Sequence, residues 1–231
     1  MGSMIEMTSN RSTIGGYLAV PESGRGPGVI VIQEWWGLVP HITDVVDRFA
    51  SAGFVALAPD LYHGQATTEP DEAGKLMMAL NATHAAADIS GTVDLLLAHE
   101  AVSGTQLGVV GFCMGGGLAL IAASLRPDAI AACVPFYGLI PWEALKPDYT
   151  RITAKVRGHF AELDGFFGPD LARGLEADLR AHGIDASIEI HPGVEHAFFN
   201  DSRAEVYDTA ASAAAWHSTI EFFRAELSSA I

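Results

Sequence analysis

A cysteine enclosed by two glycines is the most informative of the residues in this chain that could do chemistry. Residues 111–115 read Gly-Phe-Cys-Met-Gly, with an apolar run before them and a helical pattern after them. A glycine–x–nucleophile–x–glycine sequence between a strand and a helix makes a sharp turn that exposes the nucleophile, here Cys113. The N–H groups that open the helix would stabilise a thiolate or an oxyanion. A free cysteine is also often a simple core residue, so the pentapeptide alone leaves that interpretation open.

A carboxylate and an imidazole base should follow such a nucleophile along the chain. After Cys113, His196 is the histidine expected in a loop beyond a strand, reached through the Pro-Gly turn at 192–193. The histidines expected at a helix end, inside a helix or within strands are His182, His217, His159 and His191. Asp164, followed by a glycine, is the predicted acid, with Glu162 as the alternative. In such a trio the carboxylate orients the imidazole, which takes the thiol proton.

The elements around these residues follow two alternating hydrophobic patterns. Continuous apolar runs, typical of strands buried on both faces, alternate with segments of helical periodicity. The predicted strands are residues 13–20, 28–33, 54–58, 106–110, 130–136, 154–162 and 186–191. The predicted helices are residues 42–52, 70–80, 85–99, 115–125, 169–182 and 205–227. This order predicts an α/β fold with a mostly parallel sheet and helices on both faces, residues 13–20 forming an antiparallel edge strand.

The predicted topology brings the reactive residues to one edge of the sheet. Cys113, Asp164 and His196 each follow a predicted strand, and the carboxyl ends of parallel strands face a common crevice. The sequence shows no repeat, linker or charge block, so residues 1–231 are predicted to be a single domain. Residues 1–10 are expected to be a disordered or tag-derived start.

Composition excludes several classes of partner. The 231 residues carry 13 basic and 28 acidic side chains, a formal net charge of −15, so neither nucleic acid nor an anionic membrane is an expected partner. Glycines interrupt the uncharged window at 107–125, which is not predicted to span a membrane. Two cysteines favour a reducing compartment, and a cytoplasmic location is expected. The nine histidines form no close-spaced cluster in the sequence, so neither a metal nor a cofactor is expected.

Six short motifs carry a resemblance to a known family. They are Gln-Glu-Trp-Trp-Gly at 33–37, Ala-Pro-Asp-Leu-Tyr at 58–62, Gly-Phe-Cys-Met-Gly-Gly-Gly at 111–117, Tyr-Gly at 137–138, Asp164, and His-Ala-Phe at 196–198. With these motifs the chain resembles the dienelactone hydrolases (carboxymethylenebutenolidases), which have the α/β-hydrolase fold. The similarity extends from about residue 28 to residue 223. A cysteine nucleophile combined with a glutamate after the first buried strand is specific, since most relatives have serine in this turn.

The resemblance implies a set of catalytic groups. It implies a triad of Cys113, His196 and Asp164 that hydrolyses esters or lactones through an acyl-thioester. It also implies that the backbone N–H groups of Trp35 and Met114 form the oxyanion hole.

Glu34 is a further candidate, next to the nucleophile. In the family, the corresponding glutamate contacts the resting thiol and moves away when substrate activates the site. A physical reason exists for such a contact, because a nearby carboxylate disfavours the thiolate, the form of cysteine that oxidises.

The substrate pocket is expected to be apolar and uncharged. The aromatic residues expected to line it, with core packing as the alternative, are Trp35, Trp36, Tyr62, Tyr137 and Phe198. Family members that act on the acidic lactone hold its carboxylate with arginines, one of them four residues after the catalytic histidine. Asn200 stands at that place, with Arg203 three residues further, and region 67–75 has Lys75 as its sole cation. The sequence therefore favours a neutral ester, thioester or lactone.

A cysteine-dependent hydrolase, monomeric or a small homo-oligomer, is the leading hypothesis. The alternative from another class is a non-catalytic small-molecule-binding or regulatory protein on the same scaffold. A redox sensor at Cys113 is a third hypothesis, disfavoured because no resolving cysteine lies nearby in the sequence. Cys133, inside a predicted strand, is expected to be an inert buried thiol.

Overall fold

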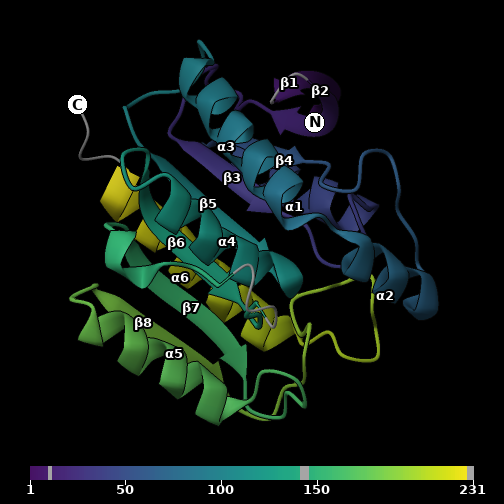
Figure 1. Cartoon of the computed structure of the whole chain (residues 1–231), viewed down its shortest axis with the longest axis vertical. Coiled ribbons are helices and arrows are strands. Elements are labelled where there is room, and N and C mark those ends of the chain that lie inside the picture. Colours follow the sequence, from purple (N-terminus) through teal and green to yellow (C-terminus); the bar gives the residue numbers. More distant parts are fainter. Residues whose placement is uncertain (10–11, 141–145, 228–231) are drawn as a thin grey trace.

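An eight-stranded β-sheet forms the centre of the structure, a computed structural model that describes residues 1–9, 12–140 and 146–227. The strands lie in the order β1-β2-β4-β3-β5-β6-β7-β8. Their bounds are β1 Ser3–Ser9, β2 Ser12–Ala19, β3 Gly28–Ile32, β4 Val55–Pro59, β5 Leu107–Phe112, β6 Ile130–Phe136, β7 Lys155–Ala161 and β8 Ala186–His191. The β1–β2 and β2–β4 pairs are antiparallel, and the strands from β4 to β8 are parallel to one another (Figure 1).

Helices cover both faces of this sheet (Figure 1). Their bounds are α1 Pro40–Ser51, α2 Pro70–Ala79, α3 Ala82–Ala98, α4 Met114–Leu125, α5 Pro169–Ala181 and α6 Thr209–Leu227. α1 and α6 share one core, in which the rings of Phe49 and Phe223 lie 5.9 Å apart. α3, α4 and α5 pack on the other face, where they bury Leu96, Leu118 and Leu179. None of these helices, as far as the structure describes them, is long and apolar enough to cross a membrane.

The predicted α/β class is confirmed, and its physical basis is visible in the burial pattern. Every residue of β3, β4 and β5 is buried, which matches their continuous apolar runs. α1 is amphipathic instead and buries Ile42, Val45 and Phe49 against the sheet. It ends just before Gly53, whose φ of 101° turns the chain back toward β4.

The N-terminal segment differs from expectation. Ser3–Ser9 form β1, so the expectation of a disordered start is wrong for these residues. β1 pairs with β2 along its length, from Ser3 opposite Leu18 onward, which makes β2 an inner strand and not the edge. The sequence pattern did not indicate β1 because exposed Ser3, Met4 and Glu6 interrupt its apolar residues, so it lacks a hydrophobic run.

Two element boundaries also differ in ways that matter for the site. β5 continues to Phe112, two residues past the predicted end, and so ends directly before Cys113. α6 begins at Thr209 and not at residue 205, because the Asp208 carboxylate accepts a hydrogen bond of 2.8 Å from the backbone N–H of Ala211 and caps the helix there.

Candidate active site

Cys113 lies between β5 and α4, where the backbone turns sharply. Its φ of 54° and ψ of −122° are strained for a residue with a side chain. Met114 begins α4, so the thiol stands at the N-terminus of that helix. The flanking glycines make this turn possible: a Cβ on Gly111 would overlap the carbonyl of Gly115, and a Cβ on Gly115 would lie 2.5 Å from two carbonyl oxygens at the end of β3. The local sequence therefore places the sulfur in the turn.

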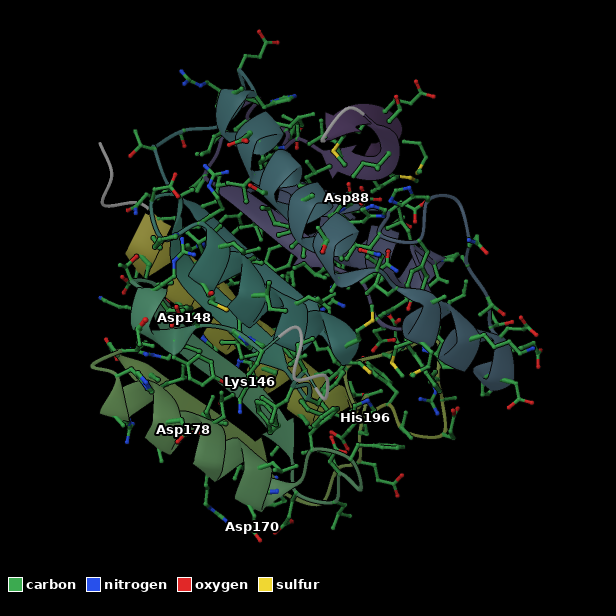
Figure 2. The ribbon with its side chains drawn as sticks, viewed as in Figure 1. Asp88, Lys146, Asp148, Asp170, Asp178 and His196 are labelled. Atoms are coloured by element: carbon green, nitrogen blue, oxygen red, sulfur yellow. The ribbon has the colours of Figure 1, made fainter. Side chains whose placement is uncertain are left out.

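His196 and Asp164 form a hydrogen-bonded pair on the next loops along the sheet. The Nδ1 atom of His196 lies 2.8 Å from Oδ2 of Asp164. The Oδ1 atom of Asp164 accepts two backbone N–H groups, from Phe166 at 2.7 Å and from Phe167 at 3.0 Å, which hold the carboxylate in the loop after β7. His196 lies in the loop after β8, beyond the carboxyl ends of the parallel strands (Figure 2). The carboxylate thus fixes the orientation of the ring.

The electrostatics of this pair favour an imidazolium. Burial lowers the pKa of His196, but hydrogen bonds and charge from Asp164 and from the Cys113 thiol outweigh burial and raise the pKa to about 10. Burial raises the pKa of Asp164, and His196 together with the two backbone N–H groups outweighs it and lowers the pKa below its usual value. The sulfur and the carboxylate therefore act on the same ring, as the order of these residues in the sequence predicts.

Glu34 is a buried carboxylate just after β3, 1% exposed. Its Oε2 atom accepts a hydrogen bond of 2.7 Å from Nδ2 of Asn200, and its Oε1 atom accepts one of 3.4 Å from the Tyr137 hydroxyl. Both side-chain hydrogen bonds of Glu34 therefore go to these two residues and not to the Cys113 thiol. Burial, followed by the negative charge of Glu34, raises the pKa of Tyr137 well above its usual value, so the hydroxyl stays a donor.

A cavity of about 540 Å³ lies over the cysteine and the histidine. The described residues that line it are Glu34, Trp35, Trp36, Pro70, Met77, Cys113, Met114, Leu139, Phe166, Phe167, His196, Ala197 and Arg203. Most are apolar, and Glu34 and Arg203 are the acidic and basic residues among them. The Arg203 guanidinium lies 5.9 Å from the ring centre of Trp36 and 2.8 Å from the Glu205 carboxylate. The site combines an apolar wall with a few polar groups, which is typical of a small-molecule pocket.

The expected aromatic residues are divided between the cavity and the layer behind it. Trp35 and Trp36 line the cavity, whereas Tyr62, Tyr137 and Phe198 are absent from the lining residues given above. These three side chains are buried, which matches the core-packing alternative, and so their expected place in the lining is wrong. They fill the space behind the reactive groups: the Tyr62 hydroxyl donates to the Met114 sulfur at 3.6 Å, and the Tyr137 ring packs edge-on at 5.2 Å from the His196 ring.

The sequence reasoning missed other parts of the wall. Phe166 and Phe167 line the cavity, and their place directly after Asp164 in the same loop is a signal that could have indicated it. Arg203, three residues after the position where the family has an arginine, also lines the cavity. Pro70 and Met77 belong to α2, and no local pattern connects that helix to the cysteine.

The two backbone groups expected to form an oxyanion hole stay a prediction. Met114 is the first residue of α4, and the first four N–H groups of a helix have no acceptor within it. Trp35 lies in the turn after β3, in which the N–H of Gly37 bonds to the Glu34 carbonyl at 3.4 Å. Both residues line the cavity beside Cys113.

Cys133 has a different environment from Cys113. It is fully buried in β6, and burial raises the pKa of its thiol far above the usual value. A thiol of this kind is inert at neutral pH, in agreement with the prediction for it.

The order of the strands that precede Cys113, Asp164 and His196 defines the class of protein. A nucleophile turn after one parallel strand, followed along the chain by an acid and a histidine after later strands, is the arrangement of the α/β-hydrolase fold. The model of the dienelactone hydrolase family matches residues 14–227, and the chain belongs to that family.

Relatives and solved structures agree with this assignment. "Protein usf" of Aquifex pyrophilus is 40% identical over 230 residues, covering 97% of this chain and 98% of that protein. A protein of Aquifex aeolicus (strain VF5) named "Putative carboxymethylenebutenolidase" is 35% identical, covering 98% of this chain and 100% of that protein. The crystal structure described as "Putative Dienelactone Hydrolase" from Klebsiella pneumoniae is 27% identical and superposes with a TM-score of 0.86, covering 96% of this chain and 98% of that one. The chain is therefore a hydrolase of this family.

Proposed function

We propose that this chain is a carboxylic ester hydrolase of carboxymethylenebutenolidase type that cleaves a small ester, thioester or lactone through an acyl-thioester on Cys113. The observation that carries the proposal is the contact chain from the strained Cys113 turn to His196 and on to Asp164, with 2.8 Å between imidazole and carboxylate. The names of the relatives agree with this reaction class.

The first half-reaction forms the acyl-enzyme. His196 accepts the Cys113 proton, and the thiolate attacks the substrate carbonyl carbon. The oxygen of the tetrahedral intermediate carries the negative charge and accepts hydrogen bonds from the backbone N–H groups of Trp35 and Met114. When the C–O or C–S bond to the leaving group breaks, the imidazolium of His196 donates its proton to that group. An acyl-thioester remains on the sulfur.

The second half-reaction returns the enzyme to its starting state. His196 takes a proton from water, and the hydroxide attacks the thioester carbonyl. Collapse of the intermediate breaks the C–S bond, releases the acid and returns a proton to the sulfur. Throughout both halves Asp164 keeps Nδ1 of the ring engaged, so that Nε2 is the nitrogen available to the sulfur, the leaving group and water.

Glu34 would tune the nucleophile in this scheme. It lines the same cavity as Cys113, and its charge disfavours a second negative charge on the sulfur. Asn200 and Tyr137 hold the carboxylate in place, so it would protect the resting thiol from oxidation without taking part in proton transfer.

We propose a neutral substrate with an apolar acyl part. The wall of Trp35, Trp36, Phe166 and Phe167 suits an apolar group, whereas an added carboxylate would meet the charge of Glu34. Arg203 is the arginine in the lining that could offset this repulsion, but it already pairs with an exposed glutamate.

Turnover of p-nitrophenyl acetate, combined with intact-protein mass spectrometry, tests the proposal. Wild-type protein should release p-nitrophenol and show a transient acetyl adduct, and Cys113→Ala should lose about 10³-fold or more in kcat/KM with an unchanged circular dichroism spectrum. Cys133→Ala is the matched control and should keep both turnover and the adduct.

Two outcomes would contradict the proposal. Equal turnover in Cys113→Ala would remove the thiol from the reaction. No turnover and no adduct with wild-type protein, across p-nitrophenyl esters of several acyl lengths, would favour the non-catalytic binding protein instead.

A further inference from the structure

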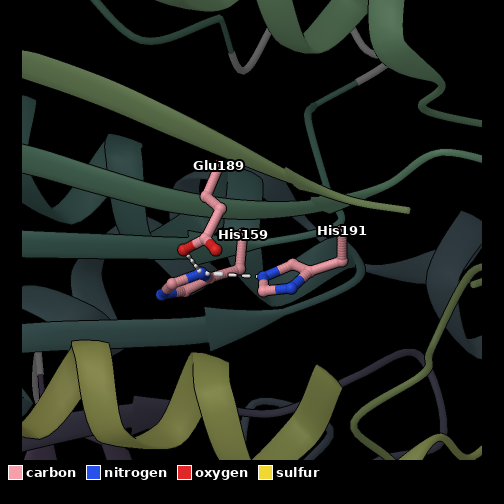
Figure 3. Close-up of side chains that lie close together, drawn as sticks. All are labelled: His159, Glu189 and His191. Atoms are coloured by element: carbon pink, nitrogen blue, oxygen red, sulfur yellow. Dashed lines mark hydrogen bonds and ion pairs between the residues drawn. The ribbon is translucent and has the colours of Figure 1, made fainter. Parts of the chain in front are cut away.

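A second group of reactive side chains lies on the β8 side of the sheet, outside the lining of the active-site cavity. His159 on β7 stands opposite Glu189 on β8 in the strand register, and His191 follows Glu189 by two residues. Side chains two apart on a strand point to the same face, so all three project toward the side covered by α6 (Figure 3). His159 and His191 are 32 positions apart in the sequence, so the spacing of the histidines gives no sign of this proximity.

Two of the distances between the donor atoms are close to those of a tetrahedral metal site. His159 Nδ1 lies 3.1 Å from His191 Nε2 and 3.5 Å from Glu189 Oε2, and the three donor atoms lie within 4.8 Å of one another. Zinc binds histidine nitrogen and carboxylate oxygen at roughly 2.0–2.2 Å, so the edges of its coordination tetrahedron are about 3.3–3.6 Å. Two of the three separations are already within about 0.3 Å of that range.

The two histidine rings are held in place by their surroundings. The His159 ring lies 4.8 Å from Phe136, and the His191 ring lies 4.9 Å from Phe198, measured between ring centres. Nε2 of His159 lies 3.3 Å from the Thr219 hydroxyl of α6. A metal-bound histidine commonly donates its other N–H to such an acceptor, which leaves Nδ1 as a lone pair facing the site.

The burial of the three groups suits a metal site with two buried histidine ligands and one carboxylate ligand that solvent can reach. His159 and His191 are 1% and 4% exposed, while the Glu189 side chain is 54% exposed. The carboxylate supplies negative charge at the entrance, and solvent there provides a fourth ligand. Two imidazoles and one carboxylate are a donor set suited to Zn²⁺ and unsuited to Ca²⁺ or Mg²⁺, which prefer oxygen atoms alone.

We propose that His159, Glu189 and His191 bind one Zn²⁺ ion, with water as the fourth ligand. The bound ion joins β7 to β8 at the place where the chain leaves the sheet for the His196 loop, because His191 is the last residue of β8. None of the three residues lines the active-site cavity, so the ion takes no part in the reaction proposed for Cys113.

Zinc titration of metal-stripped protein by isothermal calorimetry tests this site. The titration is made in the Cys113→Ala background, so that the active-site sulfur does not contribute a second zinc site. This variant should bind one Zn²⁺ per chain, and adding Glu189→Gln should weaken binding at least roughly ten- to a hundredfold. Glu22→Gln is the matched control, because Glu22 is also exposed and its substitution removes the same charge in the turn between β2 and β3.

Thermal unfolding gives a second readout that does not depend on activity. At a hundredfold excess of Zn²⁺ over its Kd, the Tm of the background variant should rise by roughly 5–10 °C. The rise should persist with Glu22→Gln and shrink with Glu189→Gln. Glu189 is exposed, so its substitution leaves the fold intact. Absence of zinc binding, or equal binding and equal Tm shifts in all three proteins, would overturn the proposal and leave the cluster as a hydrogen-bonded histidine pair.

Discussion

Asp164→Asn tests most directly whether the carboxylate governs the imidazole. The asparagine keeps an oxygen for the N–H groups of Phe166 and Phe167, so the loop after β7 should retain its conformation. Its amide N–H₂ then faces Nδ1 of His196 in place of Oδ2. That contact favours the tautomer with the proton on Nε2, which cannot accept the thiol proton.

The size of the effect follows from the pKa of His196. A rise from 6.5 to about 10 corresponds to about 5 kcal/mol in favour of the imidazolium, to which Asp164 and Cys113 both contribute against the opposing effect of burial. Loss of a correctly oriented general base costs roughly 10²–10⁴-fold in kcat/KM. Once the thiol proton has passed to His196, the imidazolium is the form that stabilises the thiolate and protonates the leaving group, so activity should fall as the pH rises through the pKa of His196. Removal of the Asp164 charge should lower that pKa, so the alkaline limb of the pH profile should move from near pH 10 toward neutrality.

The same variant makes a prediction about stability. A histidine whose pKa is raised on folding stabilises the folded state fully below its unfolded pKa of about 6.5, and this stabilisation disappears as the pH rises through about 10. Between these pH values the free energy of unfolding of Asp164→Asn should therefore depend less on pH than that of the wild type. Urea unfolding at several pH values measures this difference.

The assay is p-nitrophenyl acetate hydrolysis from pH 5 to pH 10.5, with Asp170→Asn as the control. Asp170 lies at the start of α5 with a fully exposed side chain, so its substitution should leave both the rate and the profile unchanged. If Asp164→Asn keeps kcat/KM within tenfold of wild type and the same alkaline limb, the carboxylate does not govern the imidazole and the reasoning is refuted.

Three further predictions concern packing and charge around the site. Asn200→Ala leaves Oε2 of Glu34 buried without its partner and should lower the free energy of unfolding in urea by about 1–3 kcal/mol. Gly115→Ala places a Cβ 2.5 Å from two backbone oxygens and should lower the free energy of unfolding by about 1–3 kcal/mol or more. Gly174→Ala, whose Cβ would stand in open space on α5, should raise the free energy of unfolding by about 0.5–1 kcal/mol. Equal changes in Tm for the two variants would contradict the close approach at Gly115. Arg203→Gln should change kcat/KM for p-nitrophenyl butyrate less than about threefold, and a large loss confined to esters with a free carboxylate would show that the pocket takes anions.

The elements and the reactive residues could be predicted because their signals are local. Five consecutive residues indicate the turn around Cys113, because any side chain at Gly111 or Gly115 would collide with the backbone. Asp164 and His196 were found from topology, because each follows a strand of the parallel sheet. Their pairing at 2.8 Å then follows from the adjacency of β7 and β8.

The parts that were not predicted depend on contacts between distant segments. The Glu34–Asn200 hydrogen bond joins residues 166 positions apart, and nothing in either segment indicates the other. Tyr62 and Phe198 were expected at the cavity because aromatic residues near a site suit either a pocket or a core, and only packing decides between them. β1 escaped detection because its pairing with β2 is a backbone property, and its buried Met7 and half-buried Ile5 do not form a continuous apolar run.

The position of the imidazole depends on a strand at the edge of the sheet. β8 is last in the strand order and pairs with β7 through six consecutive residue pairs, from Val156 with Ala186 to Ala161 with His191. A slip of one residue would displace the following loop by about 3.3 Å and turn Glu189 and His191 to the opposite face. Catalytic groups tolerate only about 0.5 Å of displacement, so a slip would separate His196 from the sulfur. Ala186 and His191, buried at the two ends of β8, oppose it, because a slip would turn each to the opposite face and remove its present contacts. The reaction proposed for Cys113 therefore depends on the register of a strand that contributes none of the proposed catalytic residues.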